Sequence, residues 1–204
     1  RRHPARAAAS SFYSTAIGYL AQATNVRATA LGTRAQANGK YSTAAGELAI
    51  ATSKHATAIG GHSYASNVGS TAVGFASTAS GPYASAFGQG ARATHYGATA
   101  IGFDTYAAGY LATAVGKYSN ARADRSIAQG YKANTSEDAT NGIAIGYGSL
   151  ASNYSAIALG SQSNSSGVSS VALGDTTLAE GDYSLAARPF AVAQGTCSTA
   201  IADT

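Results

Sequence analysis

The stretch TAIGGHSYASNVGSTAVG, residues 57–74, begins with Thr-Ala-Ile-Gly and ends with Thr-Ala-Val-Gly. Its two matching glycines, Gly60 and Gly74, lie fourteen residues apart. The same interval continues in both directions, and each repeat is numbered here from its glycine as position one. Because a fixed short period is typical of repeat architectures, this interval predicts stacked coils of one kind. Position one is occupied by Gly18, Gly32, Gly46, Gly60, Gly74, Gly88, Gly102, Gly116, Gly130, Gly146, Gly160 and Gly174.

Four positions of the repeat carry only small side chains. Position thirteen is Ala in every complete repeat, position eleven is Ala, Ser or Gly, and position four is Ala, Ser or Thr. Position six is Ala apart from Thr135 and Ser165. Because these positions pair at a spacing of two, each repeat is predicted to hold two short strands that face each other. A Leu in these columns would overpack the narrow interior at a cost of about 1–3 kcal/mol.

Turn residues separate the two predicted strands. Position one is Gly, and position eight is often Gly or Asn, as in Gly39, Asn67 and Gly81. These residues tolerate positive φ, which we expect at both turns. The predicted fold class is all-β, a parallel β-solenoid of about fourteen coils that would span about 65–70 Å at the usual strand spacing. We expect a single domain over residues 1–204, with one two-residue insertion between 130 and 146.

Position fourteen forms an apolar ridge on the outside of the predicted solenoid. A strip about 10 Å wide would expose on the order of 700 Å², more than a monomer usually tolerates. Outward positions three and five of the other strand are mixed and often polar, so we expect only that sheet to face water. The ridge predicts association of identical chains, although it does not distinguish two chains from three. The expected interface residues are Ile17, Leu31, Ile59, Val73, Phe87, Ile101, Val115, Ile145, Leu159, Leu173 and Ile201.

The composition excludes several other classes of protein. Charged residues make up 11% of the chain and hydrophobic residues 45%, whereas disordered chains are less hydrophobic and more charged. The net charge is +4, and beyond the first six residues the basic side chains are scattered, so no nucleic-acid partner is expected. The single cysteine, Cys197, cannot form an internal disulfide. No membrane-spanning run or signal peptide is recognised.

The stretch NGIAIGYGS, residues 141–149, resembles the YadA-like head repeat of the trimeric autotransporter adhesins. That repeat reads roughly Asn-Ser-Val-Ala-Ile-Gly-x-x-Ser, and the stretches SAIALGSQS (155–163) and SSVALGDTT (169–177) are similar to it. The resemblance covers nearly the whole chain. One departure is position twelve, which is Thr in most of the early repeats and becomes aliphatic from Ile127 to Leu185.

The resemblance implies a left-handed parallel β-roll that assembles as a homotrimer, with the ridges toward a common axis. It implies the head of an adhesin at the cell surface, exposed from the Gram-negative outer membrane. Such heads attach to extracellular-matrix proteins such as collagen or fibronectin, to other cell-surface ligands, or to one another in autoagglutination. We expect the chain to be a fragment, with membrane contact only through an anchor outside it.

Candidate catalytic and metal-binding motifs have simpler interpretations. GYGSLA, residues 146–151, matches a dinucleotide fingerprint, but no helix is expected to follow it. His55, His62 and His95 do not share a position in the repeat, and the acidic residues scatter over different positions. We therefore expect no catalytic residue, metal or cofactor, and no enzyme.

Outward tyrosines are the candidate ligand-contact surface, because Tyr offers apolar area together with a hydroxyl group. The alternative is that each tyrosine only packs on the adjacent coils. Two acidic residues of the insertion are further candidates. The candidates are Tyr13, Tyr41 and Tyr83 at position ten, Tyr96, Tyr110 and Tyr154 at position nine, and Glu137 and Asp138 in the insertion.

Other functions remain open from the residues alone. The Thr column at position twelve would suit an ice-binding β-solenoid, but it is flanked by an aliphatic column and ends at Thr113. A trimeric phage fibre segment would use the same packing. A polysaccharide-degrading solenoid would need clustered acids, which the repeat does not provide.

Overall fold

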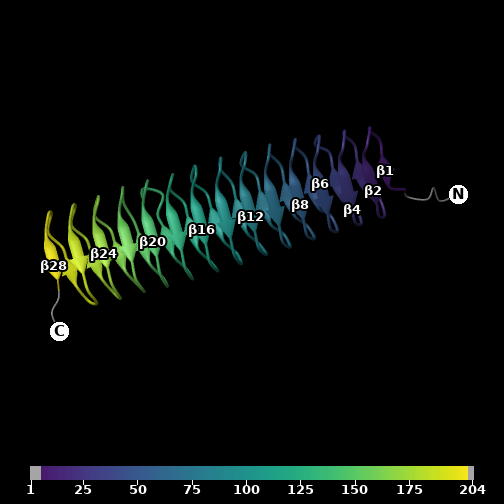
Figure 1. Cartoon of the computed structure of the whole chain (residues 1–204). Helices are drawn as coiled ribbons and strands as arrows, with labels where there is room; N and C mark the ends of the chain where they lie inside the picture. Colours follow the sequence, from purple (N-terminus) through teal and green to yellow (C-terminus); the bar gives the residue numbers. More distant parts are fainter. Residues whose placement is uncertain (1–5, 202–204) are drawn as a thin grey trace. The chain divides into compact units, whose positions relative to one another are not determined.

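The computed structural model describes residues 6–201, which contain strands and turns but no helix. No helix long and apolar enough to cross a membrane is therefore present in this range. The chain divides into two compact units, one ending at Gly97 and the other beginning at Ala98. Within each unit, every coil contributes two short strands (Figure 1). The single domain expected from the repeat stays a prediction.

In the first unit, the strands form two parallel sheets. Positions twelve to fourteen make the longer strands and positions five and six the shorter ones. The longer strands are β2 (Thr15–Ile17), β4 (Thr29–Leu31), β6 (Thr43–Ala45), β8 (Thr57–Ile59), β10 (Thr71–Val73) and β12 (Ser85–Phe87). The shorter strands are β1 (Ala8–Ala9), β3 (Gln22–Ala23), β5 (Gln36–Ala37), β7 (Ile50–Ala51), β9 (Tyr64–Ala65), β11 (Thr78–Ala79) and β13 (Arg92–Ala93).

The second unit repeats this arrangement, again with parallel pairing in both sheets. Its longer strands are β14 (Thr99–Ile101), β16 (Thr113–Val115), β18 (Ile127–Gln129), β20 (Ile143–Ile145), β22 (Ile157–Leu159), β24 (Val171–Leu173), β26 (Leu185–Ala187) and β28 (Thr199–Ile201). Its shorter strands are β15 (Tyr106–Ala107), β17 (Asn120–Ala121), β19 (Asn134–Thr135), β21 (Leu150–Ala151), β23 (Asn164–Ser165), β25 (Leu178–Ala179) and β27 (Val192–Ala193).

Strand register confirms the predicted fourteen-residue coil. Thr57 pairs with Thr71 and Ala58 pairs with Ala72, so identical positions of successive repeats lie side by side. The hydrogen bonds run from one coil to the next, as from the Thr15 N–H to the Ala28 carbonyl oxygen at 2.9 Å. The predicted all-β parallel solenoid is therefore confirmed.

The interior consists of the four small columns, as predicted. Ala30, Ala44 and Ala58 at position thirteen are fully buried, and so are the residues at positions four, six and eleven in the inner coils. Buried serines at positions four and eleven donate to a carbonyl three residues back, as Ser42 Oγ does to the Gly39 oxygen at 2.7 Å. Ser can therefore replace Ala at most of these positions with its hydroxyl paired. The exceptions are Ser184 and Ser198 at position eleven and Thr105 at position four, whose buried hydroxyls have no hydrogen-bond partner among the described residues.

The two exceptions at position six have a shared explanation. Thr135 Oγ1 donates to Ser126 Oγ at 2.9 Å, across the interior. The hydroxyl groups of Ser165 and Ser170 lie 2.6 Å apart in the same arrangement. Each polar residue at position six therefore faces a serine at position eleven, directly before a longer strand, so that both hydroxyls are hydrogen-bonded.

The expectation of positive φ at position eight is wrong. Gly39 and Gly81 do not adopt positive φ. A Cβ atom built on Gly39 would instead lie 1.9 Å from the carbonyl oxygen of Ser53 in the next coil. At Gly39 the close approach of two backbones therefore leaves no room for a Cβ atom. Where the residue is Asn67, its Oδ1 accepts from the Val68 N–H at 2.9 Å and its Nδ2 donates to the Ser80 oxygen at 3.2 Å.

Positive φ occurs instead at positions one, three and ten. Position one combines a φ near +130° with close backbone contact, as at Gly18. Positions three and ten adopt the left-handed region with ordinary residues, such as His62 (φ 58) and Tyr41 (φ 61). Position three was predicted to lie on the outer face of a strand, but it belongs to a turn. Side chains at these two positions project from the turns as two rims along each unit.

The predicted two-residue insertion lies in a sixteen-residue coil. The Asn141 N–H donates to the Asp124 oxygen at 3.0 Å, the bond that position ten makes in the other coils. Ala139 is buried and takes the place of position eight. The extra residues therefore fall within 136–138, and Ile127 still pairs with Ile143 beyond them.

Candidate binding surfaces

The predicted interface residues lie on the outer face of the longer strands. Ile59 and Phe87 in the first unit are 41% and 40% exposed, and Ile101 in the second unit is 42% exposed. The remaining surface of each ridge residue is covered by its neighbours in adjacent coils. Each unit therefore presents a row of partly covered apolar side chains that faces solvent in a single chain, with the small Ala45 in the row of the first unit and Gln129 and Ala187 in that of the second.

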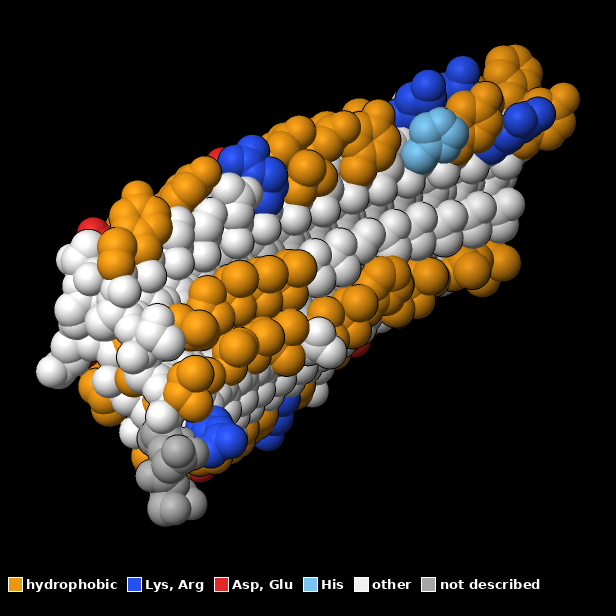
Figure 2. Space-filling model, turned by 60° about the vertical axis from the view of Figure 1, so that its left-hand side comes forward, with side chains coloured by type: hydrophobic (Ala, Val, Ile, Leu, Met, Phe, Trp, Pro, Cys, Tyr) orange, Lys and Arg blue, Asp and Glu red, His pale blue; other side chains and the backbone are white. Residues whose placement is uncertain are grey.

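This apolar face is wider in the second unit. Position twelve there carries aliphatic residues beside the ridge, such as Ile157 and Val171 next to Leu159 and Leu173. Figure 2 shows two adjacent rows of hydrophobic side chains on this part of the surface. In the first unit the neighbouring column is Thr at most coils, so the ridge there is a single row.

The tyrosines proposed as ligand contacts all lie in turns. Tyr13 is 81% exposed, Tyr154 is 51% exposed, and Tyr41 is half-buried. Tyr83 and Tyr96 form an edge-to-face contact with ring centroids 5.6 Å apart. These tyrosines therefore contact adjacent coils and are also accessible from solvent.

The remaining candidates are exposed and dispersed. Glu137 and Asp138 of the insertion are exposed, and so are His55, His62 and His95. Within residues 6–201, no three His, Cys, Asp or Glu side chains are grouped so that they could hold a metal ion. His62 instead contacts Phe75 edge-on at 5.5 Å.

Sequence reasoning missed a column of basic and aromatic residues at positions nine and ten of the first unit. The Arg27 guanidinium lies between two tyrosines, 5.7 Å from the Tyr13 ring centroid and 5.6 Å from that of Tyr41. Tyr41 stacks on His55 at 5.0 Å with an interplanar angle of 6°. The basic residues described as scattered are thus partly assembled. We call this surface the basic rim; it consists of Tyr13, Arg27, Lys40, Tyr41, Lys54 and His55.

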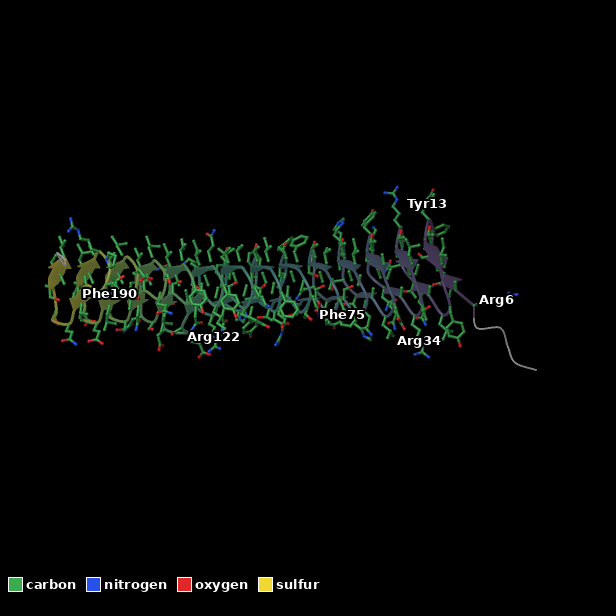
Figure 3. The ribbon with its side chains drawn as sticks, turned by 90° about the horizontal axis from the view of Figure 1, so that it is seen from below. Arg6, Tyr13, Arg34, Phe75, Arg122 and Phe190 are labelled. Atoms are coloured by element: carbon green, nitrogen blue, oxygen red, sulfur yellow. The ribbon has the colours of Figure 1, made fainter. Side chains whose placement is uncertain are left out.

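Figure 2 shows blue and pale blue side chains interleaved with orange ones along this rim. Tyr13 projects from one edge of the first unit and Arg34, at position three, from the opposite edge (Figure 3). The repeat register already contained the signal, because Arg27 and His55 occupy the same position as Tyr13 and Tyr41.

A row of aromatic rings on the position two and three rim of the second unit was also missed. Phe103, Tyr118, Tyr131 and Tyr147 follow one another with centroid distances of 5.6, 5.9 and 5.4 Å. The Lys117 Nζ lies 5.2 Å from the Phe103 centroid and 5.0 Å from that of Tyr118. These rings support one another across successive coils, as aromatic pairs do in protein interiors.

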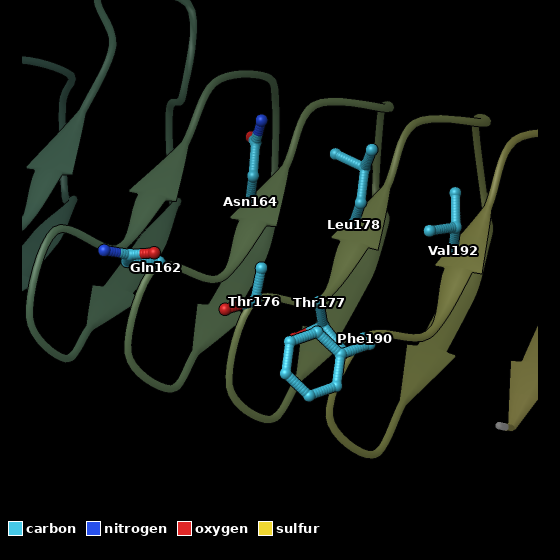
Figure 4. Close-up of a pocket in the computed structure, with 7 residues that line it drawn as sticks. All are labelled: Gln162, Asn164, Thr176, Thr177, Leu178, Phe190 and Val192. Atoms are coloured by element: carbon cyan, nitrogen blue, oxygen red, sulfur yellow. The ribbon is translucent and has the colours of Figure 1, made fainter. Parts of the chain in front are cut away.

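A shallow pocket of about 380 Å³ lies on the shorter-strand face of the second unit (Figure 4). Phe190 stands at one side, and Asn164 and Leu178 lie on adjacent strands. The buried Asn164 Oδ1 has no hydrogen-bond partner among the described residues. The pocket is open and mostly apolar, and no charged residue lines it.

Comparison with known proteins places this geometry in a family. The model of the YadA head domain repeat matches residues 9–105, 107–163 and 165–187 in overlapping pairs of repeats. Among solved structures, the chain is similar to the collagen-binding domain of the Yersinia adhesin YadA, with 24% identity and a TM-score of 0.32. That match covers 83% of this chain and 70% of the other. No curated protein matches the chain.

Proposed function

The chain belongs to the family of YadA head domain repeats, which form adhesin-type heads, and we propose that it acts as a non-catalytic trimer at the cell surface. In this proposal the trimer is exposed from the Gram-negative outer membrane and attaches to extracellular-matrix proteins such as collagen or fibronectin. The role requires a rigid, repetitive surface, because many weak identical contacts add through multivalency. Contact between heads of neighbouring cells is a further part of the proposal.

The observation that carries the proposal is the exposed ridge. Its residues recur in most coils of both units, and several of them, such as Ile59 and Ile101, stay about two fifths exposed although they are apolar. Extended apolar surfaces of this kind mark association sites. Three ridges that meet at a common axis would remove them from water. The interior of a single chain contributes little stability by itself, because it is filled almost entirely by the small side chains of Ala and Ser.

Replacing two ridge residues tests the interface. We expect the wild-type chain to have three times the mass of one chain by light scattering. The double variant Ile59→Asp with Ile101→Asp should lose that species and give monomer or aggregate, because carboxylates would face one another in an apolar contact. An unchanged oligomeric mass in this variant would show that the interface is elsewhere.

The chain provides a matched control on the opposite sheet. Ile50 and Leu150 are aliphatic residues at the outward position five, one in each unit, and are half-buried. The double variant Ile50→Asp with Leu150→Asp introduces the same charges and should keep the oligomeric mass. If both double variants dissociate equally, the effect comes from general destabilisation.

Attachment itself is tested with the purified oligomer on immobilised collagens, fibronectin and laminin. We expect saturable binding to at least one of these proteins, and a large loss of apparent affinity when the ridge variant abolishes the oligomer, because avidity then disappears. Absence of binding to every matrix protein would contradict the proposed role.

A further inference from the structure

The charges of the chain are divided unequally between its two units. Residues 1–97 contain eight Lys and Arg and a single acid, Glu47, whereas residues 98–204 contain five basic and eight acidic residues. Glu47 occupies position two, on the rim opposite positions nine and ten. The basic rim of the first unit therefore contains cations that no carboxylate of its own edge neutralises.

The cations of the basic rim are arranged in a line. Arg27, Lys40 and Lys54 come from three successive coils and are all exposed. Backbone hydrogen bonds between successive coils hold these residues in order. The His55 N–H donates to the Lys40 carbonyl oxygen at 2.9 Å, and the Gly69 N–H donates to the Lys54 carbonyl oxygen at 3.0 Å. Successive coils repeat at about 4.8 Å, so the rim presents positive charge at short, regular intervals. Such a line fits a linear polyanion better than a single small anion.

Aromatic rings of the rim contact Arg27 and Lys40, and both faces of Tyr41 are covered, whereas Tyr13 at the end of the rim stays 81% exposed. Tyr41 is covered by the Arg27 guanidinium from the preceding coil and by the His55 ring from the following one. The Lys40 Nζ lies 5.1 Å from the same ring centroid. Single-stranded nucleic acids bind by stacking bases on open aromatic faces, and Tyr41 has none to offer.

Uncharged polar groups line the same turns. Position seven carries Thr24, Asn38 and Thr52, which are exposed or half-buried. Their hydrogen bonds are made within the rim, as from Thr24 Oγ1 to Asn38 Oδ1 at 3.0 Å. Hydroxyl and amide groups of this kind can also bond the hydroxyl groups of a sugar chain.

From these observations we propose that the basic rim binds a sulfated linear polysaccharide. Its sulfate groups pair with Arg27, Lys40 and Lys54, and its hydroxyl groups lie against the neighbouring polar side chains. The inference rests on the proposed attachment function, for which it names a class of ligand and the surface that holds it. Binding is electrostatic and therefore weakens as salt rises.

The test uses the purified oligomer and an end-labelled heparin oligosaccharide, with affinity measured by fluorescence anisotropy over a range of salt concentrations. The triple variant Arg27→Gln, Lys40→Gln, Lys54→Gln should bind roughly tenfold or more weakly, because three charge pairs are lost. The plot of log affinity against log salt concentration should become less steep in this variant, its slope smaller in magnitude by about two to three, because three contacts no longer release counterions.

A matched variant removes the same charge from positions two and three of the repeat in the two units. Arg34→Gln, Lys117→Gln, Lys132→Gln replaces three exposed cations at positions two and three and should change the affinity less than about twofold. An equal loss in both triple variants would overturn the assignment of the basic rim, because net charge alone would then explain binding.

Two competing ligands complete the test. Desulfated heparin of the same length should bind much more weakly than heparin, and single-stranded and duplex DNA of equal charge should bind no more tightly. Tighter binding of DNA, or no binding of heparin, would overturn the proposal. Light scattering of the same samples shows whether the oligomer is intact. If an intact oligomer binds a matrix protein but not heparin, the inference about the basic rim is wrong and the proposed function is not affected.

Discussion

At the scale of single residues, glycine meets two different requirements in this chain. At position one it adopts a φ that L residues rarely take and also touches the backbone of the next coil, as Gly60 does with Gly74. At position eight it has no unusual φ and is required only because the next coil lies against its Cα atom. Left-handed φ at positions three and ten is carried by bulky residues whose side chains point outward from the turns.

Replacing Gly39 should therefore be costly even though its backbone is unstrained. Gly39→Ala places a Cβ atom 1.9 Å from the Ser53 carbonyl oxygen, which is backbone and cannot rotate away. We expect the free energy of unfolding to fall by about 1–3 kcal/mol or more, measured by chemical denaturation.

Gly61 provides the control for this substitution. Its φ is ordinary, and a Cβ atom there would meet the Phe75 side chain at 3.4 Å, a normal contact distance. Gly61→Ala should be neutral or stabilise by about 0.4–1 kcal/mol through the unfolded state. Equal destabilisation by both substitutions would disprove the close-approach argument.

At the scale of the strands, stability depends on how closely the two sheets approach each other. The small side chains of Ala and Ser fill most of the interior, and the largest fully buried side chains are Thr105, Thr135 and Thr177. The hydroxyl groups of buried serines are mostly satisfied by their own turns, so Ala and Ser are interchangeable at positions four and eleven.

Neighbouring residues of strand β5 test the predicted direction of the side chains. Ala37 is fully buried, whereas Gln36 beside it faces outward and is half-buried. Ala37→Leu should lower the free energy of unfolding by about 1–3 kcal/mol or more, because no space exists for the larger side chain. Gln36→Leu should change it by less than about 0.5 kcal/mol. Thermal denaturation of both variants measures the difference, and a reversed order would contradict the assigned faces.

At the scale of the whole molecule, two properties cannot be assigned to any single coil. One is the ridge, whose energetic importance comes from its repetition in most coils. The other is the unequal charge of the two units, which places the basic rim in the first of them. We propose both as surfaces for partners.

The single domain inferred from the uninterrupted repeat leads to a prediction about unfolding. If residues 1–204 behave as one domain, differential scanning calorimetry of the oligomer should give one transition, because repeat proteins are coupled through neighbouring coils. Two separated transitions would mean that the units ending at Gly97 and beginning at Ala98 unfold independently.

The repeat in the sequence was sufficient to predict the coil, the four inward columns, the ridge and the insertion. It was sufficient because Ala at position thirteen and Gly at position one recur in nearly every coil, and strand geometry allows few ways to stack them. The sequence did not reveal why Gly39 is glycine, nor that Arg27 lies between Tyr13 and Tyr41. Both depend on distances between residues of different coils, and those distances are set only when the coils hydrogen-bond to one another. The tertiary structure therefore decided which backbones touch and which charges share a rim.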